Sequence, residues 1–531
     1  MKYRWYYSLL FSSVLVLVNC GKRKTTFTDE DVFRYNESAN IQTLDPAFAR
    51  NMAIIWPCNQ LFSGLVQLDD SLHVQPDIAR SWHISADGLQ YDFSLRKDVY
   101  FHKHALFGKD STRVVTASDF VYSFDRLLDK KTASPGTWIF QNVKKYEAVN
   151  DTLLRIQLHQ PFPAFLSLLS MEYASVVPKE ITENPSIDFR SNPVGTGPYQ
   201  FQLWEENIKL VLRKNSLYYE KDAEGRSLPY LESIAITFLP DKQSSYLQFI
   251  QGKIDFISGS DLSYKDDLLQ ANGELREKYR TTIHQNIGPY LNTEYLGFNM
   301  NDPQMKDKRL RQALNMGFDR NKMVAFLRNG MGDAKVYGII PTGLVVNTDQ
   351  MVEYNPLEAK KLVEQIKKES KKPIEITLNT NSTYLDIAEY LQREWEKIGL
   401  KVKIDVMPPS TLRQAIATNK VGFFRASWIA DYPDAENYLS LFYSKNFTPN
   451  GPNYTHFSNA TFDFLYEKAL QTVNEDERKQ LYKQMNDIIA EEVPVIVLFY
   501  DKVARFSQKN ITGLNNNPMN ILNVKYIQKK K

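Results

Sequence analysis

Cysteine and histidine are scarce in this sequence. The 531 residues include two cysteines, Cys20 and Cys58, and seven histidines. Two cysteines are too few for a disulfide framework, and their spacing does not match a zinc site. Cys58 follows Trp56-Pro57 in an apolar run, which predicts a buried free thiol. His102 and His104 lie close together in the sequence, but no carboxylate cluster accompanies them, so we expect no metal site.

An excess of one charge is also missing. The chain has 65 basic and 62 acidic residues, which gives a formal net charge of +3. A nearly balanced surface argues against nucleic acid as a partner. The strongest basic run is Lys529-Lys530-Lys531 at the C-terminal end, which we expect to be a solvated tail.

Familiar catalytic motifs are absent. The sequence contains neither Gly-x-Ser-x-Gly nor His-Glu-x-x-His. Gly195-Thr196-Gly197 has the spacing of a phosphate loop, but Pro198 follows and lacks the backbone N–H that such a loop would use. We therefore predict a turn at this point. We also expect that the protein is not an enzyme and uses no cofactor.

Long apolar runs are rare, and the clearest one lies near the N-terminus. It covers residues 8–18, follows Lys2 and Arg4, and is too short to span a bilayer comfortably. A short apolar run behind basic residues is typical of a secretory signal. No later segment is long and apolar enough to predict a transmembrane helix.

The apolar run ends in Leu17-Val18-Asn19-Cys20, which resembles a bacterial lipobox. In that motif the cysteine is lipidated and becomes the mature N-terminus, although Asn19 departs from the small residue preferred there. We expect residues 1–19 to be a signal peptide, Cys20 to be the lipidation site, and residues 20–29 to form a leader that tethers the protein to a membrane. The alternative is an ordinary secretory signal with a chance cysteine.

The length of the chain predicts two or three domains. The clearest local unit lies at residues 374–406. Residues 374–378 alternate as in a strand, apolar residues recur every three or four positions over 385–398 as on one helix face, and residues 400–406 alternate again. The crossover is long enough to join parallel strands, so we predict an α/β fold.

The most informative segment is Phe424-Arg425-Ala426-Ser427-Trp428-Ile429-Ala430-Asp431-Tyr432. It alternates apolar and polar residues like a strand and ends on a carboxylate between aromatic residues. On the residues alone, two interpretations stay open. Asp431 belongs either to a plain acidic turn, with Trp428 in the core, or to a ligand site.

Several motifs occur in an order that resembles one known family. They are Leu44-Asp45-Pro46, Gly64-Leu65-Val66, Pro76-Asp77-Ile78-Ala79-Arg80-Ser81-Trp82, Ala86-Asp87-Gly88, Thr116-Ala117-Ser118-Asp119 and Pro193-Val194-Gly195-Thr196-Gly197-Pro198-Tyr199. With the segment 424–432, they resemble the oligopeptide-binding proteins of bacteria, which are extracytoplasmic receptors of peptide ABC importers in the peptide/nickel class. The resemblance covers about residues 30–510.

The resemblance implies a two-lobed α/β fold with a hinge and an extra inserted domain. Lobe I would consist of residues 30–55, 185–283 and 498–531, and lobe II of residues 284–497. The inserted domain would cover residues 56–184. Ligand would be held between the two lobes, which close over it.

The resemblance also implies a peptide site. Asp431 would take the peptide's α-ammonium, Arg425 a peptide carboxylate, and Trp428 would wall a side-chain pocket. An extended peptide would lie between two extended segments. The implied ligand-binding residues are Arg425, Ser427, Trp428, Ile429, Asp431 and Tyr432 on one side, and Ala49, Arg50, Asn51 and Met52 on the other. Some members of the family have glutamate in place of Arg50, so charge preference would differ here.

The implied function is capture of short peptides and their delivery to the permease and ATPase subunits of an ABC importer. The protein would be a monomer, lipid-anchored in the periplasm or on the cell surface. One alternative keeps the fold and changes the ligand to haem, a nickel chelate or a murein peptide. Another is a surface adhesin or signalling receptor.

Overall fold

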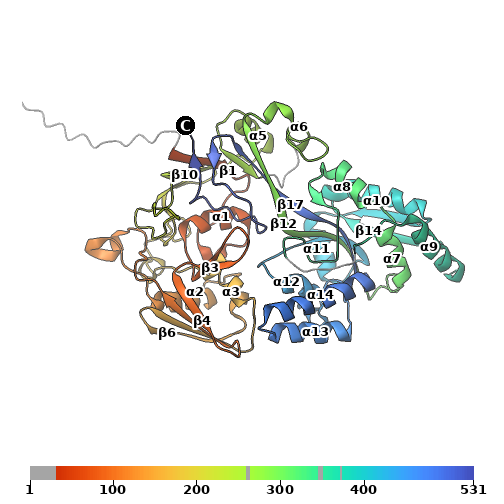
Figure 1. Ribbon diagram of the computed structural model, residues 1–531, viewed down its shortest axis with the longest axis horizontal. Coiled ribbons are helices and arrows are strands. Elements are labelled where there is room, and N and C mark those ends of the chain that lie inside the picture. Colours follow the sequence, from red (N-terminus) through yellow and green to blue (C-terminus); the bar gives the residue numbers. More distant parts are fainter. Residues whose placement is uncertain (1–30, 259–263, 345–350, 371–372, 531) are drawn as a thin grey trace, which may run out of the picture.

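The computed structural model describes residues 31–258, 264–344, 351–370 and 373–530 (Figure 1). The predicted signal peptide (1–19), the leader (20–29) and Cys20 lie outside the described residues. In Figure 1 the red-to-yellow part of the chain fills the left half of the molecule, and most of the cyan-to-blue part fills the right half. The two-lobed α/β architecture expected from the sequence is therefore the one observed.

One 11-stranded sheet runs through both halves. Its order is β15-β14-β16-β12-β17-β11-β1-β10-β9-β8, and β13 pairs with β17 beside this path. In that order the strands are β15 (Lys401–Val406), β14 (Glu375–Thr380), β16 (Phe423–Ile429), β12 (Ile283–Phe298), β17 (Val495–Gln508), β11 (Phe256–Ser258), β1 (Val32–Asn36), β10 (Ser233–Thr237), β9 (Lys209–Lys214), β8 (Tyr199–Glu205) and β13 (Gly332–Asp333).

The antiparallel strands β12 and β17 carry the sheet from one half to the other. β17 pairs with β11 at residues 505–507, and β12 pairs with β16 at residues 292–298. Between these regions the β12–β17 register is interrupted between Pro289 and Thr293. The predicted boundary at 283/284 falls at the start of β12 and that at 497/498 falls within β17. The assignment of residues to lobes stays a prediction.

The β-α-β unit predicted at residues 374–406 is confirmed. β14 and β15 are parallel, with Glu375 opposite Lys401 and Thr380 opposite Val406. Helix α10 (Leu385–Lys397) connects them and buries its apolar face. Trp395 on that face is fully buried, and its indole N–H donates a hydrogen bond to the Leu314 carbonyl at 2.9 Å. The period of the apolar residues was therefore sufficient to place this helix.

Helices cover the sheet or join its strands. The described helices are α1 (Met52–Leu61), α2 (Ala117–Leu128), α3 (Phe165–Leu168), α4 (Lys179–Thr182), α5 (Lys242–Ile250), α6 (Lys265–Leu268), α7 (Lys308–Met316), α8 (Arg320–Arg328), α9 (Pro356–Ser370), α10, α11 (Pro409–Ala417), α12 (Glu436–Leu439), α13 (Ala460–Gln471) and α14 (Glu475–Glu492).

A second, four-stranded antiparallel sheet lies within the predicted inserted segment. Its order is β4 (Ala79–Ile84), β5 (Gln90–Leu95), β7 (Leu153–Leu158) and β6 (Val143–Asn150). Helix α2 packs on β6 and β7, and Thr116 caps its N-terminus, with the Thr116 N–H donating to the Asp119 carboxylate at 2.8 Å. The buried side chains of this segment continue into those of residues 33–62 and 194–256, so one core serves both.

The remaining described strands form two short antiparallel pairs: β2 (Val66–Leu68) with β3 (Val74–Pro76), and β18 (Ile511–Thr512) with β19 (Gln528–Lys529).

The segment Gly195-Thr196-Gly197, where the sequence predicts a turn, has no regular secondary structure; the chain bends at Gly197 and Pro198, and the segment packs against the end of α1. A Cβ at Gly195 would collide with the Leu61 carbonyl, and one at Gly197 would lie 2.6 Å from the Gln60 carbonyl oxygen. His102 is buried against the same segment: its Nδ1 accepts the Gly195 N–H at 3.2 Å and its Nε2 lies 3.1 Å from the Gly197 carbonyl. The glycines therefore permit close backbone packing, and His102 holds the segment.

The expectation of a solvated C-terminal tail is wrong for Lys529. Its ammonium lies 2.7 Å from the Asp255 carboxylate, and its side chain is 4% exposed. The cause is the pairing of β19 with β18, which carries Lys529 back onto the sheet beside β11.

By contrast, Cys58 is the buried free thiol that the sequence predicts. Across the described ranges, no helix is sufficiently long and apolar to span a bilayer.

Candidate functional site

A cavity of about 60 Å³ brings together residues from several parts of the chain. Four of the predicted site residues line it, namely Ala49, Met52, Asp431 and Tyr432. The other lining residues come from the segment around α3, from β2, from α1 and from the C-terminal segment: Ile55, Leu68, Ser167, Ser170, Met171, Glu172, Tyr173, Pro433, Met519 and Ile521. The cavity is apolar on most sides, and Asp431 and Glu172 supply its carboxylates. We call it the Asp431 cavity.

Asp431 is held in place by a neighbour that the sequence analysis missed. Strand β16 ends at Ile429, and Asp431 follows two residues later. Buried Asn437 accepts hydrogen bonds from the Trp428 indole N–H at 2.8 Å and from the Asp431 backbone N–H at 3.3 Å. Asn437 also hydrogen-bonds the Asp431 carboxylate. One side-chain amide thus fixes both the strand end and the acid.

The electrostatic environment of Asp431 favours a positively charged ligand. Asp431 is an exposed residue that lines the Asp431 cavity, and protein atoms nearby reduce the hydration of its carboxylate. This loss of hydration raises the pKa of Asp431, and the hydrogen bond from Asn437 only partly opposes the shift. Among the described residues, no lysine, arginine or histidine forms an ion pair with it. A cation bound beside Asp431 would therefore stabilise the ionised form of its carboxyl group.

The predicted ligand strand has an unpaired edge. Along one side β16 pairs with β12 from Phe423 to Ile429. Along the other side its pairing with β14 is at Asn379 and Phe424, and no other described strand continues it. The backbone from Ala426 to Ile429 is therefore open on that side. An open edge can pair with an extended peptide backbone.

Arg425 already has a carboxylate partner. Its guanidinium forms an ion pair with Glu294 on β12, and it lies 3.3 Å from the centre of the Tyr384 ring. Both charged side chains are buried, at 11% and 2% exposure. Arg425, Ser427, Trp428 and Ile429 do not line the Asp431 cavity. A peptide carboxylate at Arg425 would have to compete with Glu294, so this part of the prediction stays open.

The predicted opposite side, Ala49 to Met52, is only partly extended. Asn51 has extended φ and ψ angles, but its side chain caps α1 and Met52 is already the first residue of that helix. Arg50 is exposed. Burial and then the charge of Asp431 raise the pKa of Tyr173 to about 12, while Arg50 opposes the shift. Arg50 and Asp431 therefore act on the same side chain from different sides of the cleft.

Tyr432 closes one side of the cleft. Its ring centre lies 6.2 Å from that of Trp138 and 6.3 Å from that of Phe162, both in the predicted inserted domain. Its hydroxyl donates to buried Glu436. Tyr432 thus connects the segment after β16 to the opposite half of the molecule, a contact that sequence spacing could not reveal.

The fold and this cleft define a class of protein, the two-lobed α/β binding proteins. Residues 73–450 match the family model of the bacterial extracellular solute-binding proteins, family 5, and the chain belongs to this family. Proteins of this family are the solute-binding components that deliver ligands to ABC importers. The resemblance inferred from the motifs is thereby confirmed.

Similar proteins span nearly the whole chain. The glutathione-binding protein GsiB of Salmonella paratyphi A is 28% identical over 488 residues, which cover 90% of each chain. The solved structure of HbpA2 from Haemophilus parasuis matches with a TM-score of 0.83 and 23% identity, covering 94% of this chain and 100% of that one. The DppA protein of Helicobacter pylori, solved with the peptide STSA, matches with a TM-score of 0.75 and 24% identity over 94% of this chain and 98% of that one. The structural matches show the shared fold.

Proposed function

We propose that this chain captures short peptides between its lobes, holds their α-ammonium at Asp431, and delivers them to the permease and ATPase subunits of an ABC importer. The observation that carries the proposal is the carboxylate of Asp431, which faces a cavity between the lobes and has no cationic partner among the described residues. A peptide's α-ammonium would supply the positive charge that Asp431 lacks among the described residues.

The expected contribution of Asp431 is large. Nearby protein atoms disfavour its charged form, and an ammonium in contact restores it. Asp431 is exposed in this ligand-free structure, so the size of the effect depends on the bound peptide and the closed lobes shielding the pair from water. Removing one member of a pair shielded in this way costs about 3–5 kcal/mol, because the other charge is left without a partner. Such a loss corresponds to about a hundredfold or more in affinity.

Backbone recognition would make the site tolerant of peptide sequence. The open edge of β16 offers backbone groups to one side of an extended peptide. Arg50, exposed on the opposite side, would favour an acidic group nearby. Peptides share their ammonium and amide groups, so these contacts bind many sequences.

A thermodynamic cycle tests the role of Asp431. Protein freed of ligand by unfolding and refolding is titrated calorimetrically with Ala-Ala-Ala and with N-acetyl-Ala-Ala-Ala, for the wild type and for Asp431→Asn. Asp405→Asn is a matched control, because Asp405 is an exposed aspartate on β15 outside the cavity. Both the acetyl group and the substitution are expected to weaken binding about a hundredfold, and together they should cost little more than either alone.

Two outcomes would overturn the proposal. One is equal binding of the free and acetylated peptides by the wild type. The other is a ligand of a different class, such as haem or a metal chelate, in mass spectra of the material released when the protein as purified is unfolded. Glutathione belongs in the titration as well, because it is a tripeptide with a free α-ammonium and the similar protein GsiB is a glutathione-binding protein.

The proposal places the protein outside the cytoplasm as a monomer anchored through a lipid on Cys20. The support is the sequence Leu17-Val18-Asn19-Cys20 after an apolar run. In cells fed a radiolabelled fatty acid, the wild type should carry label and sediment with membranes, whereas Cys20→Ser should carry none and be released. An unlabelled wild-type protein would show that the run is an ordinary secretory signal.

A further inference from the structure

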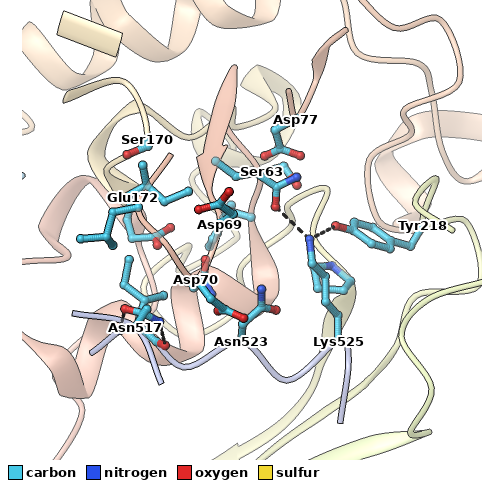
Figure 2. Close-up of a pocket in the computed structure, with 17 residues that line it drawn as sticks. Ser63, Asp69, Asp70, Asp77, Ser170, Glu172, Tyr218, Asn517, Asn523 and Lys525 are labelled. Carbon is cyan, nitrogen blue, oxygen red and sulfur yellow. Dashed lines mark hydrogen bonds between the residues drawn. The ribbon is translucent and has the colours of Figure 1, made fainter. Parts of the chain in front are cut away.

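A second cavity borders the Asp431 cavity and is lined by acids (Figure 2). It has a volume of about 60 Å³, and the carboxylates of Asp69, Asp70, Asp77 and Glu172 face it. In Figure 2 the side chains of Asp69, Asp70 and Glu172 point toward the same space, with Asn517 and Asn523 of the C-terminal segment beside them. We call this space the acidic cavity. Its lining combines the first strands of the predicted inserted domain with the end of the chain.

The two cavities share part of their walls. Leu68, Ser170, Glu172 and Ile521 line both of them. A ligand held at Asp431 therefore has the acidic cavity as its neighbour, with Glu172 at the boundary.

The cation in the lining does not balance these acids. Lys525 is the one lysine or arginine among the described residues that line the acidic cavity. Its ammonium already has Glu220 at 2.5 Å and Gln67 at 2.8 Å. Its charge is thus shared between Glu220, which does not line the cavity, and Asp77, which does.

Among the acids that line the acidic cavity, Glu172 has no side-chain hydrogen-bond donor and no ion pair within the described part of the chain. Protein encloses its carboxylate, and the residue stays partly accessible because it faces the cavities. An enclosed carboxylate without donor or cation is costly to maintain unless a ligand supplies one. Across the described ranges, no three His, Cys, Asp or Glu side chains are placed to hold a metal ion, so the chemistry that fits is an organic cation.

The Asp431 cavity, which both acids line, is mostly apolar. Met52, Met171, Met519 and Leu68 are among its apolar lining residues. Methionine side chains adapt to the shape of a flexible guest. A volume of about 60 Å³ in the acidic cavity is room for roughly two waters, or for an ammonium with its last methylene.

We propose that the acidic cavity binds the side-chain ammonium of a lysine at the first position of a peptide, while Asp431 holds that residue's α-ammonium. The lysine methylenes would lie against the methionines and Leu68. This proposal rests on the proposed function and adds a preference for a basic N-terminal residue. Glu172 is a specificity-determining residue in this account.

The test compares Lys-Ala-Ala with Nle-Ala-Ala, because norleucine keeps the methylene chain without the charge. The wild type is expected to prefer the lysine peptide by about tenfold or more, and Glu172→Gln should reduce that ratio to about one, whatever it does to the affinity that both peptides share. Glu183→Gln is the matched control, since Glu183 follows α4 and lines neither cavity. The wild-type ratio needs no variant, so a misfolded Glu172→Gln leaves the proposal testable.

Protons provide a second measurement. Burial, and then the charge of Asp77, raise the pKa of Glu172 to about 8. A cation beside Glu172 favours its charged form, so the lysine peptide should release more protons than the norleucine peptide at pH 7, measured by calorimetry in two buffers of different ionisation enthalpy. Its preference should also grow as the pH rises from about 6 to about 8. The other charged or titratable groups that face Glu172 or its cavities, or act on it electrostatically, are Asp69, Asp70, Asp77, Lys525, Tyr218, Tyr173, Cys58, Asp431 and Tyr432.

The outcomes separate the two proposals. If neither peptide binds, the proposed function itself is wrong. If both bind equally well, peptide capture stands and the acidic cavity is not a ligand subsite. If the lysine preference survives in Glu172→Gln unchanged, the ammonium is bound elsewhere and the assignment to this cavity is wrong.

Discussion

The ion pair between Glu294 and Arg425 gives the sharpest prediction about the stability of predicted lobe II. Glu294 lies on β12 just beyond the irregularity that follows Pro289, and Arg425 lies on the predicted ligand strand β16. Glu294 also accepts hydrogen bonds from Tyr384 and Asn292, each at 3.2 Å. The substitution Glu294→Gln removes the charge and keeps the shape, so Arg425 is left buried beside a neutral amide.

The magnitude follows from burial. At 2% and 11% exposure the pair is largely out of water, and removing one partner of such a pair costs about 3–5 kcal/mol. A cost of 1 kcal/mol lowers the melting temperature of a 150–250-residue domain by about 2–4 °C, so we expect a fall of about 6–20 °C for lobe II. Arg425→Met leaves Glu294 near Asp501 without compensation and should cost at least as much. The double variant should recover part of the loss, because neither charge is then unpaired.

Calorimetric melting of the ligand-free protein measures the effect. Glu396→Gln is the control, since Glu396 is an exposed glutamate on α10 that forms no ion pair with any residue the structure describes. A fall of less than about 2 °C for Glu294→Gln, or single-variant losses that simply add in the double variant, would refute the reasoning. The pair would then contribute nothing beyond its separate side chains.

Two further predictions concern pH and backbone packing. Burial raises the pKa of four carboxyl groups to about 7 or 8, namely those of Asp77, Asp501, Glu436 and Glu172. The folded protein therefore keeps protons on these groups that the unfolded chain has already lost. As the pH rises from 6.5 to 8 this advantage disappears, so the melting temperature should fall. Burial lowers the pKa of His102 to about 4, which acts in the opposite direction but only below its unfolded pKa of about 6.5. A flat or rising melting temperature over that interval would contradict the acid assignment. Separately, Gly195→Ala should destabilise the protein by about 2–3 kcal/mol in urea unfolding, because the added Cβ would collide with the Leu61 carbonyl. Gly288→Ala is the control, because a Cβ there makes only ordinary contacts. Equal losses of stability in the two variants would contradict this prediction.

Local patterns in the sequence located many elements correctly. The alternation at residues 374–378 and 400–406 and the helical period between them correspond to β14, α10 and β15. Pro198 after a Gly-x-Gly indicated a change of chain direction, and the chain bends at Gly197 and Pro198 before β8. Each of these signals lies within a few residues along the chain, and hydrophobic periodicity records directly which face is buried.

The sequence was less informative where partners are distant. Arg425 has the position of a ligand-binding residue, yet its nearest charge is Glu294, 131 residues away. Asn437, which orients Asp431, has no feature that separates it from any other asparagine in a polar stretch. Glu172 gave no signal at all, because it becomes important only where the chain near α3 meets the C-terminal segment.

The family, the α/β alternation and the acid at the end of a strand could be predicted without coordinates, because they depend on local order and on motifs in succession. Which charges are already paired could be seen only in the folded chain. Burial and the distance between charges set the energy of an ionised group, and both arise only when remote segments pack together. For that reason Arg425 proved to be paired with Glu294, while Asp431 and Glu172 have no ion pair among the described residues.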